Sequence, residues 1–176
     1  MNVTAALLRR AAFLLIGSAI VVFFWRSILL GLALIILVIA AIIAWDRLKV
    51  SIAAQRFRDT YHSRGKDLVL VYSNSPHWQS YIEANWLPWW NARAVTLNWS
   101  ERATWERSRP EVALFDALAT AREYNPLAIV VLPRGAPKVV RFWRAFRDYK
   151  HGRDAKLRKQ ESELETLLAR HGPPDS

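Results

Sequence analysis

The sequence predicts an α/β protein in which an N-terminal transmembrane helical hairpin precedes a small three-layer domain with a mostly parallel sheet. Three observations predict this fold. Residues 11–45 are mostly apolar and carry a single charge, on Arg26. The rest of the chain alternates short β-rich runs with helical patterns. The length of 176 residues leaves room for one modest domain besides the apolar part.

The composition excludes several classes of protein. The chain has no cysteine, and 25 basic side chains face 15 acidic ones, for a net charge of +10. Without cysteine, a disulfide framework, a Cys-ligated metal site and a thiol nucleophile are impossible. We therefore expect no redox chemistry by the chain itself. Because the glycines form no nucleotide-binding motif and the four histidines are far apart in sequence without an HExxH motif, we also expect no cofactor and no metal.

The apolar N-terminal part is too long for one membrane span. A single helix over residues 11–45 would be roughly 52 Å long, whereas the hydrocarbon core of a bilayer is about 30 Å thick. The sequence therefore predicts two spans, at about 5–25 and 28–45, with a turn at Arg26 and Ser27. The alternative is one span at 28–45, preceded by a re-entrant or interfacial segment.

Basic residues predict the orientation of the chain. The turn offers only Arg26, whereas several basic residues closely follow the second span. Because positive charge stays on the cytoplasmic side, we expect the protein to lie in the cell (inner) membrane with its soluble part in the cytoplasm. With two spans the N-terminus is cytoplasmic too, and with one span it lies outside. The basic residues are Arg47, Lys49, Arg56, Arg58, Arg64 and Lys66.

Composition predicts four regions along the chain. Residues 1–46 form the transmembrane hairpin, and residues 47–65 form a juxtamembrane helix whose basic side can face anionic lipid. Residues 66–152 form the cytoplasmic α/β domain. Residues 153–176 form a charged C-terminal helix and tail.

The sequence of the first half of the domain predicts a strand, a helix and a second strand. Residues 68–72 of the run DLVLVYSNS (67–75) are apolar on both faces, which is typical of a central parallel strand. Ser75 and Pro76 provide an N-cap and a first-turn proline for a helix that ends before Pro88. Residues 92–99 alternate in polarity and predict a second strand.

The second half predicts a helix, a third strand and one ambiguous segment. A helix begins at Pro110 and runs to about Glu123, and LAIVVLP (127–133) is the third strand. KVVRFW (138–143) fits a fourth strand, antiparallel to the third, or the start of a helix; the short connection before it favours the strand. From about Arg144 we expect helix, interrupted at Gly152.

The resulting order, β-α-β-α-β-β-α, resembles the thioredoxin-like fold. The junction LVLVYSNSP at 68–76 lies where that family places its redox motif, and residues 125–143 (NPLAIVVLPRGAPKVVRFW) resemble its proline-preceded β-hairpin. The CxxC motif of the family is absent, because residues 73–76 are Ser, Asn, Ser and Pro. The resemblance therefore implies a non-redox member.

The sharpest candidate for a ligand site is an anion site in the loop after the first strand. Strand-end loops and helix N-termini suit phosphate or carboxylate groups. The alternative, which the sequence favours, is a structural role without a ligand, in which Ser75 caps a helix and His77 lies on the surface. No nucleotide, GxSxG or HExxH motif occurs, so we expect no catalytic residue. The candidate anion-binding residues are Ser73, Asn74, Ser75 and His77.

A basic and aromatic stretch is the strongest chemical feature. Residues 134–159 contain ten basic and two acidic residues. This pattern predicts an amphipathic helix with core aromatics, or a surface that contacts anionic lipid headgroups or a partner; nucleic acid is disfavoured. At least one tryptophan beside Pro88 should be exposed. The candidate membrane-surface or partner-binding residues are Arg141, Trp143, Arg144, Arg147, Lys150, Trp89 and Trp90.

These features predict a membrane-anchored cytoplasmic binding module, an accessory or assembly subunit of a membrane-associated complex without catalytic activity. Its expected partners are the lipid bilayer and another protein or a second copy of the chain. The alternative is a small membrane-bound enzyme or an anion-binding protein that uses the loop at 73–77. An enzyme predicts a polar pocket there, whereas an interaction protein predicts an exposed patch of tryptophan and arginine.

Overall fold

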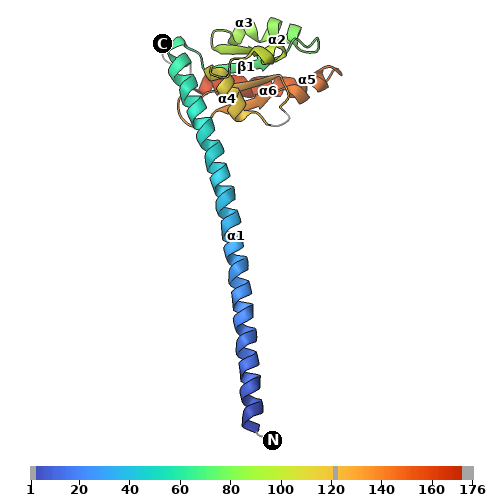
Figure 1. Cartoon of the computed structure of the whole chain (residues 1–176). Coiled ribbons are helices and arrows are strands. Elements are labelled where there is room, and N and C mark those ends of the chain that lie inside the picture. The colour runs from blue at the N-terminus through green and yellow to red at the C-terminus, as the bar shows by residue number, and fades with distance from the viewer. Residues whose placement is uncertain (1–2, 121–122, 172–176) are drawn as a thin grey trace. The chain divides into compact units, whose positions relative to one another are not determined.

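The computed structural model describes residues 3–120 and 123–171. The chain divides into two compact units that meet between Asp46 and Arg47. Helix α1 (Val3–Tyr61) supplies the first unit and continues into the second as one uninterrupted helix (Figure 1). The helical stretch Phe24–Arg64, which covers most of α1 and the short helix after it, contains a segment long and apolar enough to cross a membrane, with none of that segment buried in the protein.

The predicted helical hairpin is wrong, because α1 passes through Arg26 and Ser27 without a turn. Neither residue breaks a helix as proline does, and apolar helix formers flank both of them. Both predicted spans, 5–25 and 28–45, therefore lie in a single helix. The turn was predicted from the total apolar length and from Arg26, the charge that separates the two apolar stretches, but a single arginine does not interrupt a helix.

The second unit contains a four-stranded sheet in the order β2-β1-β3-β4. Strand β1 (Leu68–Tyr72) pairs parallel with β2 (Ala94–Asn98) and antiparallel with β3 (Leu127–Val130). Strand β4 (Lys138–Arg141) pairs antiparallel with β3. The sheet is mixed, so the prediction of a mostly parallel sheet is wrong. A strand buried on both faces has the same apolar pattern in either direction, so the pattern of β3 could not reveal its orientation.

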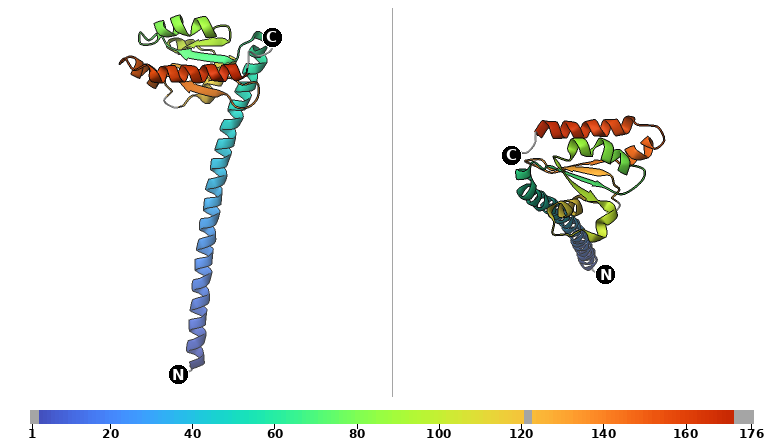
Figure 2. Two further views of the ribbon diagram at one scale, coloured as in Figure 1. Left: turned by 180° about the vertical axis from the view of Figure 1, so that it is seen from behind. Right: turned by 90° about the horizontal axis from the view of Figure 1, so that it is seen from above.

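Helices cover both faces of the sheet, which makes three layers (Figure 2). One face carries α2 (Gln79–Asn85), α3 (Leu87–Trp90), α5 (Trp143–Tyr149) and α6 (Ala155–His171). The other face carries the last turns of α1 and α4 (Pro110–Leu118). Two short 3-10 helices, η1 (His62–Arg64) and η2 (Trp99–Thr104), complete the described elements.

Strand β1 separates the two hydrophobic cores. Leu68 and Leu70 belong to the core on the α6 side, whereas Val69 and Val71 belong to the core on the α4 side. Successive side chains of a strand point to opposite faces, so a strand covered on both faces is a continuous apolar run. The C-terminal helix α6, part of the region 153–176, contributes to the first core with Leu157, Leu164 and Leu168.

The element boundaries refine the sequence analysis in two places. The helix expected from Pro76 begins only at Gln79, with Trp78 at its N-cap, so Ser75 is not the cap. Pro88 lies in the first turn of α3, where a missing backbone N–H costs nothing, instead of ending the preceding helix there.

The ambiguous segment resolves as a strand followed by a helix. Residues 138–141 form β4, antiparallel to β3, and α5 begins at Trp143, so the predicted strand is confirmed. Gly152 has a φ of 76° between α5 and α6. This left-handed conformation suits glycine and explains the predicted interruption.

Candidate functional site

The predicted anion site lies at a topological switch point of the sheet. The connection after β1 leads to α2 on one face, and the connection after β2 leads to α4 on the other. In open α/β sheets, ligands bind where neighbouring parallel strands send their connections to opposite faces. The loop at 73–78 and helix η2 border this edge.

The polar groups of the two loops bond to one another across this switch point. The backbone N–H of Asn74 donates to Ser100 Oγ at 3.0 Å. Asn98 donates from Nδ2 to Asn74 Oδ1 at 3.0 Å and to Glu101 Oε1 at 2.8 Å. These contacts link the end of β1 to the end of β2, so Asn74 is accounted for as a structural bridge.

The remaining predicted anion-binding residues lie in the same loop. Ser73 Oγ accepts a hydrogen bond from Trp78 Nε1 at 3.2 Å. Ser75 Oγ is 3.4 Å from the backbone N of His77, which donates to it, and the His77 side chain is exposed. The structure brings the four residues together, but these bonds serve the loop itself. Anion binding by this loop stays a prediction.

The basic and aromatic candidates divide into engaged and exposed residues. Arg141 makes two hydrogen bonds to the Glu123 carboxylate, at 2.9 and 3.0 Å. Partial burial alone would raise the pKa of Glu123, but hydrogen bonds from Arg141 and from backbone N–H groups outweigh it, so the pKa is lowered. Trp143 stacks on Tyr124 with ring centroids 4.9 Å apart, and Arg147 lies over the Trp143 ring at 5.3 Å.

Arg144 and Lys150 are exposed on α5 and on the turn after it. Their contact with anionic lipid headgroups stays a prediction. The two neighbouring tryptophans differ sharply: Trp89 is 80% exposed, whereas Trp90 is 6% exposed and packs in the core. The expectation that at least one of them is exposed is therefore confirmed for Trp89.

Trp89 lies at a groove of about 320 Å³ between the α2–α3 pair and α6. Its floor contains the buried carboxylate of Glu161, whose Oε1 accepts hydrogen bonds from Tyr81 Oη at 2.8 Å and from Trp86 Nε1 at 2.7 Å. Burial and the bond to Glu161 raise the pKa of Tyr81. The groove, called the Trp89 groove below, is lined by Tyr81, Asn85, Trp86, Trp89, Trp90, Arg158, Glu161 and Glu165.

The Trp89 groove is acidic although the chain is basic. Two carboxylates, of Glu161 and Glu165, line it together with one cation, Arg158. The Arg158 guanidinium is already engaged, because its Nη1 donates to Tyr81 Oη at 3.1 Å and to Glu161 Oε2 at 3.3 Å. Glu165 is exposed. The groove therefore favours a cationic group over an anionic one.

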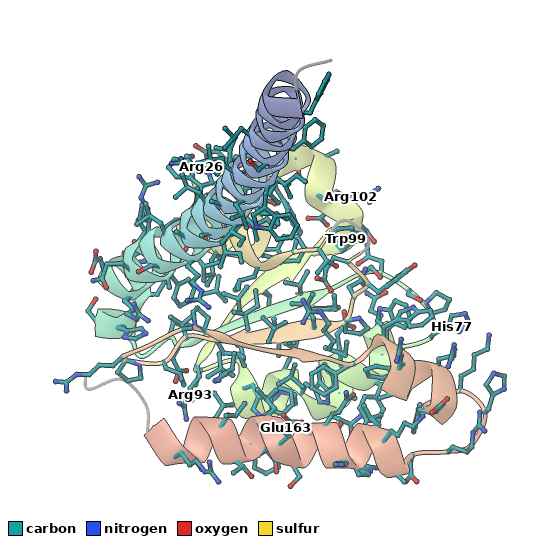
Figure 3. The ribbon with its side chains drawn as sticks, turned by 90° about the horizontal axis from the view of Figure 1, so that it is seen from below. Arg26, His77, Arg93, Trp99, Arg102 and Glu163 are labelled. Carbon is teal, nitrogen blue, oxygen red and sulfur yellow. The ribbon has the colours of Figure 1, made fainter. Side chains whose placement is uncertain are left out.

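A second pocket, of about 240 Å³, lies beside η2 and α4 on the opposite face of the sheet. Its Trp99 and Arg102 lie next to each other (Figure 3), with the guanidinium carbon 5.2 Å from the ring centroid. This pocket was not predicted from the sequence. Its only signal there is the alternation of tryptophan and arginine in WSERATWER (99–107), which matches no known motif.

Buried charges elsewhere connect elements of the fold. Glu111 is fully buried, accepts a hydrogen bond from Tyr61 Oη at 2.8 Å and forms an ion pair with Arg109. Burial and Glu111 together raise the pKa of Tyr61. Asp67 is buried and paired with Arg93. These pairs are explained by the architecture and need no ligand.

Comparisons with known proteins identify no relative. No family model matches the chain, and no curated protein or solved structure matches it. Within residues 3–120 and 123–171, no three His, Asp or Glu side chains are grouped so that they could hold a metal ion.

Proposed function

We propose that the protein is a membrane-anchored, non-catalytic binding module that serves a membrane-associated complex as an accessory or assembly subunit. Its α1 is long and apolar enough to anchor it in a membrane. The basic residues that follow the apolar stretch favour the cytoplasm for the α/β domain and the inner membrane for the anchor.

The observation that carries this proposal is the exposure of Trp89 beside a groove. An indole ring that is 80% exposed places a large apolar surface in water. Tryptophan is the residue most typical of binding hot spots, where a partner covers it. Its neighbour Trp90 fills the core in the same short helix, so packing of the domain does not require Trp89 as well.

The chemistry of the groove indicates the kind of partner. Its two carboxylates outnumber the single Arg158 guanidinium, which is itself already hydrogen-bonded. A segment of another protein that carries a lysine or arginine next to an apolar side chain would complement both Glu165 and the Trp89 ring. We assign the Trp89 groove to such a segment.

The fold is compatible with a binding module. The order of strands and helices is β-α-β-α-β-β-α after α1, with α3 and α6 as additional helices. We propose that this arrangement is thioredoxin-like and that the domain is a non-redox member, because the chain has no cysteine. Domains of such a fold can retain a binding surface in the absence of redox residues.

Photo-cross-linking in native membranes tests the proposal. A benzophenone side chain replaces Trp89 in one variant and Tyr124 in the matched control, since Tyr124 is another exposed aromatic ring, which stacks on Trp143 and does not line the groove. We expect a discrete protein adduct from position 89 and none from position 124. Mass spectrometry of the adduct should find a lysine or arginine beside the linked residue. Adding Glu165→Lys to the position 89 variant should abolish the adduct.

Other outcomes contradict the proposal in distinguishable ways. An adduct of twice the chain mass assigns the groove to a second copy of this chain instead of another protein. Adducts with lipid alone, or the same adduct from positions 89 and 124, show that the groove does not select a protein segment. An adduct that persists with Glu165→Lys would show that the negative charge of the groove does not select the partner.

A further inference from the structure

The pocket beside η2 differs from the Trp89 groove in position and in charge. It lies on the α4 side of the sheet, directly after the carboxyl end of β2, and none of its residues belongs to the Trp89 groove. We call it the Trp99 pocket. It is lined by Trp99, Arg102, Trp105, Arg107, Val112, Phe115 and Asp116.

The floor of the Trp99 pocket is a rigid aromatic cluster. Trp99, Trp105 and Phe115 pack edge to face, with centroid distances of 5.9, 5.5 and 5.6 Å. Trp105 is further fixed by its Nε1, which donates to the carbonyl of Asn98 at 3.1 Å. A floor locked by packing and hydrogen bonding loses little entropy when a ligand binds.

Two arginines line the pocket, and both are exposed. Arg102 is held over the Trp99 ring, and its Nη1 lies 3.4 Å from the Trp99 carbonyl, to which it donates. Arg107 makes no ion pair with the part of the chain that the structure describes. The one opposing charge in the lining is Asp116.

These arginines contrast with others in the domain. Arg93, Arg109 and Arg141 are each paired with a carboxylate, on Asp67, Glu111 and Glu123 respectively. The Trp99 pocket instead gathers two guanidinium groups against one carboxylate. Its charge is therefore positive, in a chain whose net charge of +10 also attracts anions.

We propose that the Trp99 pocket binds a small organic anion, a carboxylate or phosphate carried on an apolar body. Guanidinium groups recognise both anions through paired N–H donors, and the aromatic floor covers the apolar body. The site lies beside the switch point of β1 and β2, where ligands of open α/β sheets bind. A pocket of about 240 Å³ suits a ligand smaller than a drug or a cofactor, such as an aryl phosphate or a phospholipid headgroup.

Titration of the full-length chain in phosphatidylcholine nanodiscs tests this proposal. The probe is phenyl phosphate, with inorganic phosphate as the comparison, and the readout is the NMR signal of the Trp99 and Trp105 indole N–H groups. We expect saturable shifts, with tighter binding of phenyl phosphate. Arg102→Gln and Arg107→Gln should each weaken binding by about tenfold, the usual effect of losing one charged hydrogen bond.

Three control variants make the result specific. Arg170→Gln removes an exposed arginine on α6 that lines neither pocket, and it should leave binding unchanged. Asp116→Asn removes the opposing carboxylate and should tighten binding, a gain that misfolding cannot produce. Trp89→Ala should have no effect, because the Trp89 groove is a separate site; the two proposals can therefore fail independently.

The source of the anion is decided by a second set of nanodiscs that contain phosphatidic acid. The same indole shifts without probe would assign the pocket to a lipid headgroup, whereas shifts with phenyl phosphate alone would assign it to a soluble anion; each supports the proposal. It is overturned if neither anion shifts the indole signals. Shifts that survive both arginine substitutions overturn it as well.

Discussion

At the scale of single residues, Glu161 organises the polar contacts under the Trp89 groove. Its carboxylate is buried and receives hydrogen bonds from Tyr81, Trp86 and Arg158. The donors come from two elements, α2 and α6, together with the residue that links α2 to α3. Removal of a buried carboxylate leaves a buried donor without an acceptor, and here that donor is the Trp86 indole N–H.

We therefore expect Glu161→Ala to lower the free energy of unfolding by about 2–3 kcal/mol, because the Trp86 indole N–H stays buried without an acceptor. The matched control is Glu163→Ala, which removes an exposed carboxylate two residues away on the same helix (Figure 3) and should change stability by less than about 0.5 kcal/mol. Chemical denaturation in detergent micelles, followed by near-UV circular dichroism, measures both. Equal effects of the two substitutions would show that the loss of stability comes from helix propensity and not from the loss of the buried acceptor.

At the scale of elements, the last turns of α1 are part of the α/β domain. Ala53, Ala54 and Phe57 are buried in the core with α4. Arg58 donates to the backbone carbonyls of Leu132 at 2.8 Å and of Gly135 at 2.6 Å, which fixes the turn between β3 and β4. The last turns of α1 thus belong to the α/β domain.

This arrangement predicts that Phe57→Ala destabilises the α/β domain by about 3–5 kcal/mol, the usual cost of a cavity left by a buried aromatic ring. Phe57 has no exposed surface, whereas Ile52 on the same helix is 47% exposed. Ile52→Ala should therefore change stability by less than about 0.5 kcal/mol. Urea unfolding of both variants, read from tryptophan fluorescence, compares them. A small effect of Phe57→Ala would mean that the end of α1 is dispensable for the domain.

At the scale of the whole molecule, one uninterrupted helix changes the expected topology. A helix of 59 residues is about 88 Å long, far more than a hydrocarbon core of about 30 Å. With a single crossing and a cytoplasmic domain, the N-terminus lies on the opposite side of the membrane. A hairpin would place both on the same side.

Because the chain has no cysteine, single-cysteine variants report this topology without background. We expect Asn2→Cys to react with an impermeant maleimide in right-side-out membrane vesicles. Ser108→Cys, at an exposed position of the domain, should react only after the vesicles are opened. Protection of both cysteines in sealed vesicles would indicate that the N-terminus and the domain lie on the same side of the membrane, as in a hairpin. Labelling of Ser108→Cys before the vesicles are opened would contradict a cytoplasmic domain.

Local sequence patterns predicted the positions of most helices and strands, but few of the contacts between them. The apolar run of β1, the alternation of β2 and the proline at the start of α4 all have local causes, so their positions were predictable. The environments of Trp89 and Trp90 were not, because helix phase alone decides which of two adjacent rings enters the core. The Trp99 pocket was equally hidden, since its lining joins residues of η2 to residues of α4.

The sequence by itself determined the apolar N-terminal stretch, the basic charge, the absence of thiol chemistry and the positions of β1, β2 and β3, because each depends on composition or on short-range periodicity. Only the tertiary structure decided that α1 is continuous, that β3 runs antiparallel to β1, and that the two pockets lie on opposite faces of the sheet. Strand direction and pocket lining depend on contacts between residues distant in the chain. Such contacts are selected by packing of the whole core, which no local pattern records.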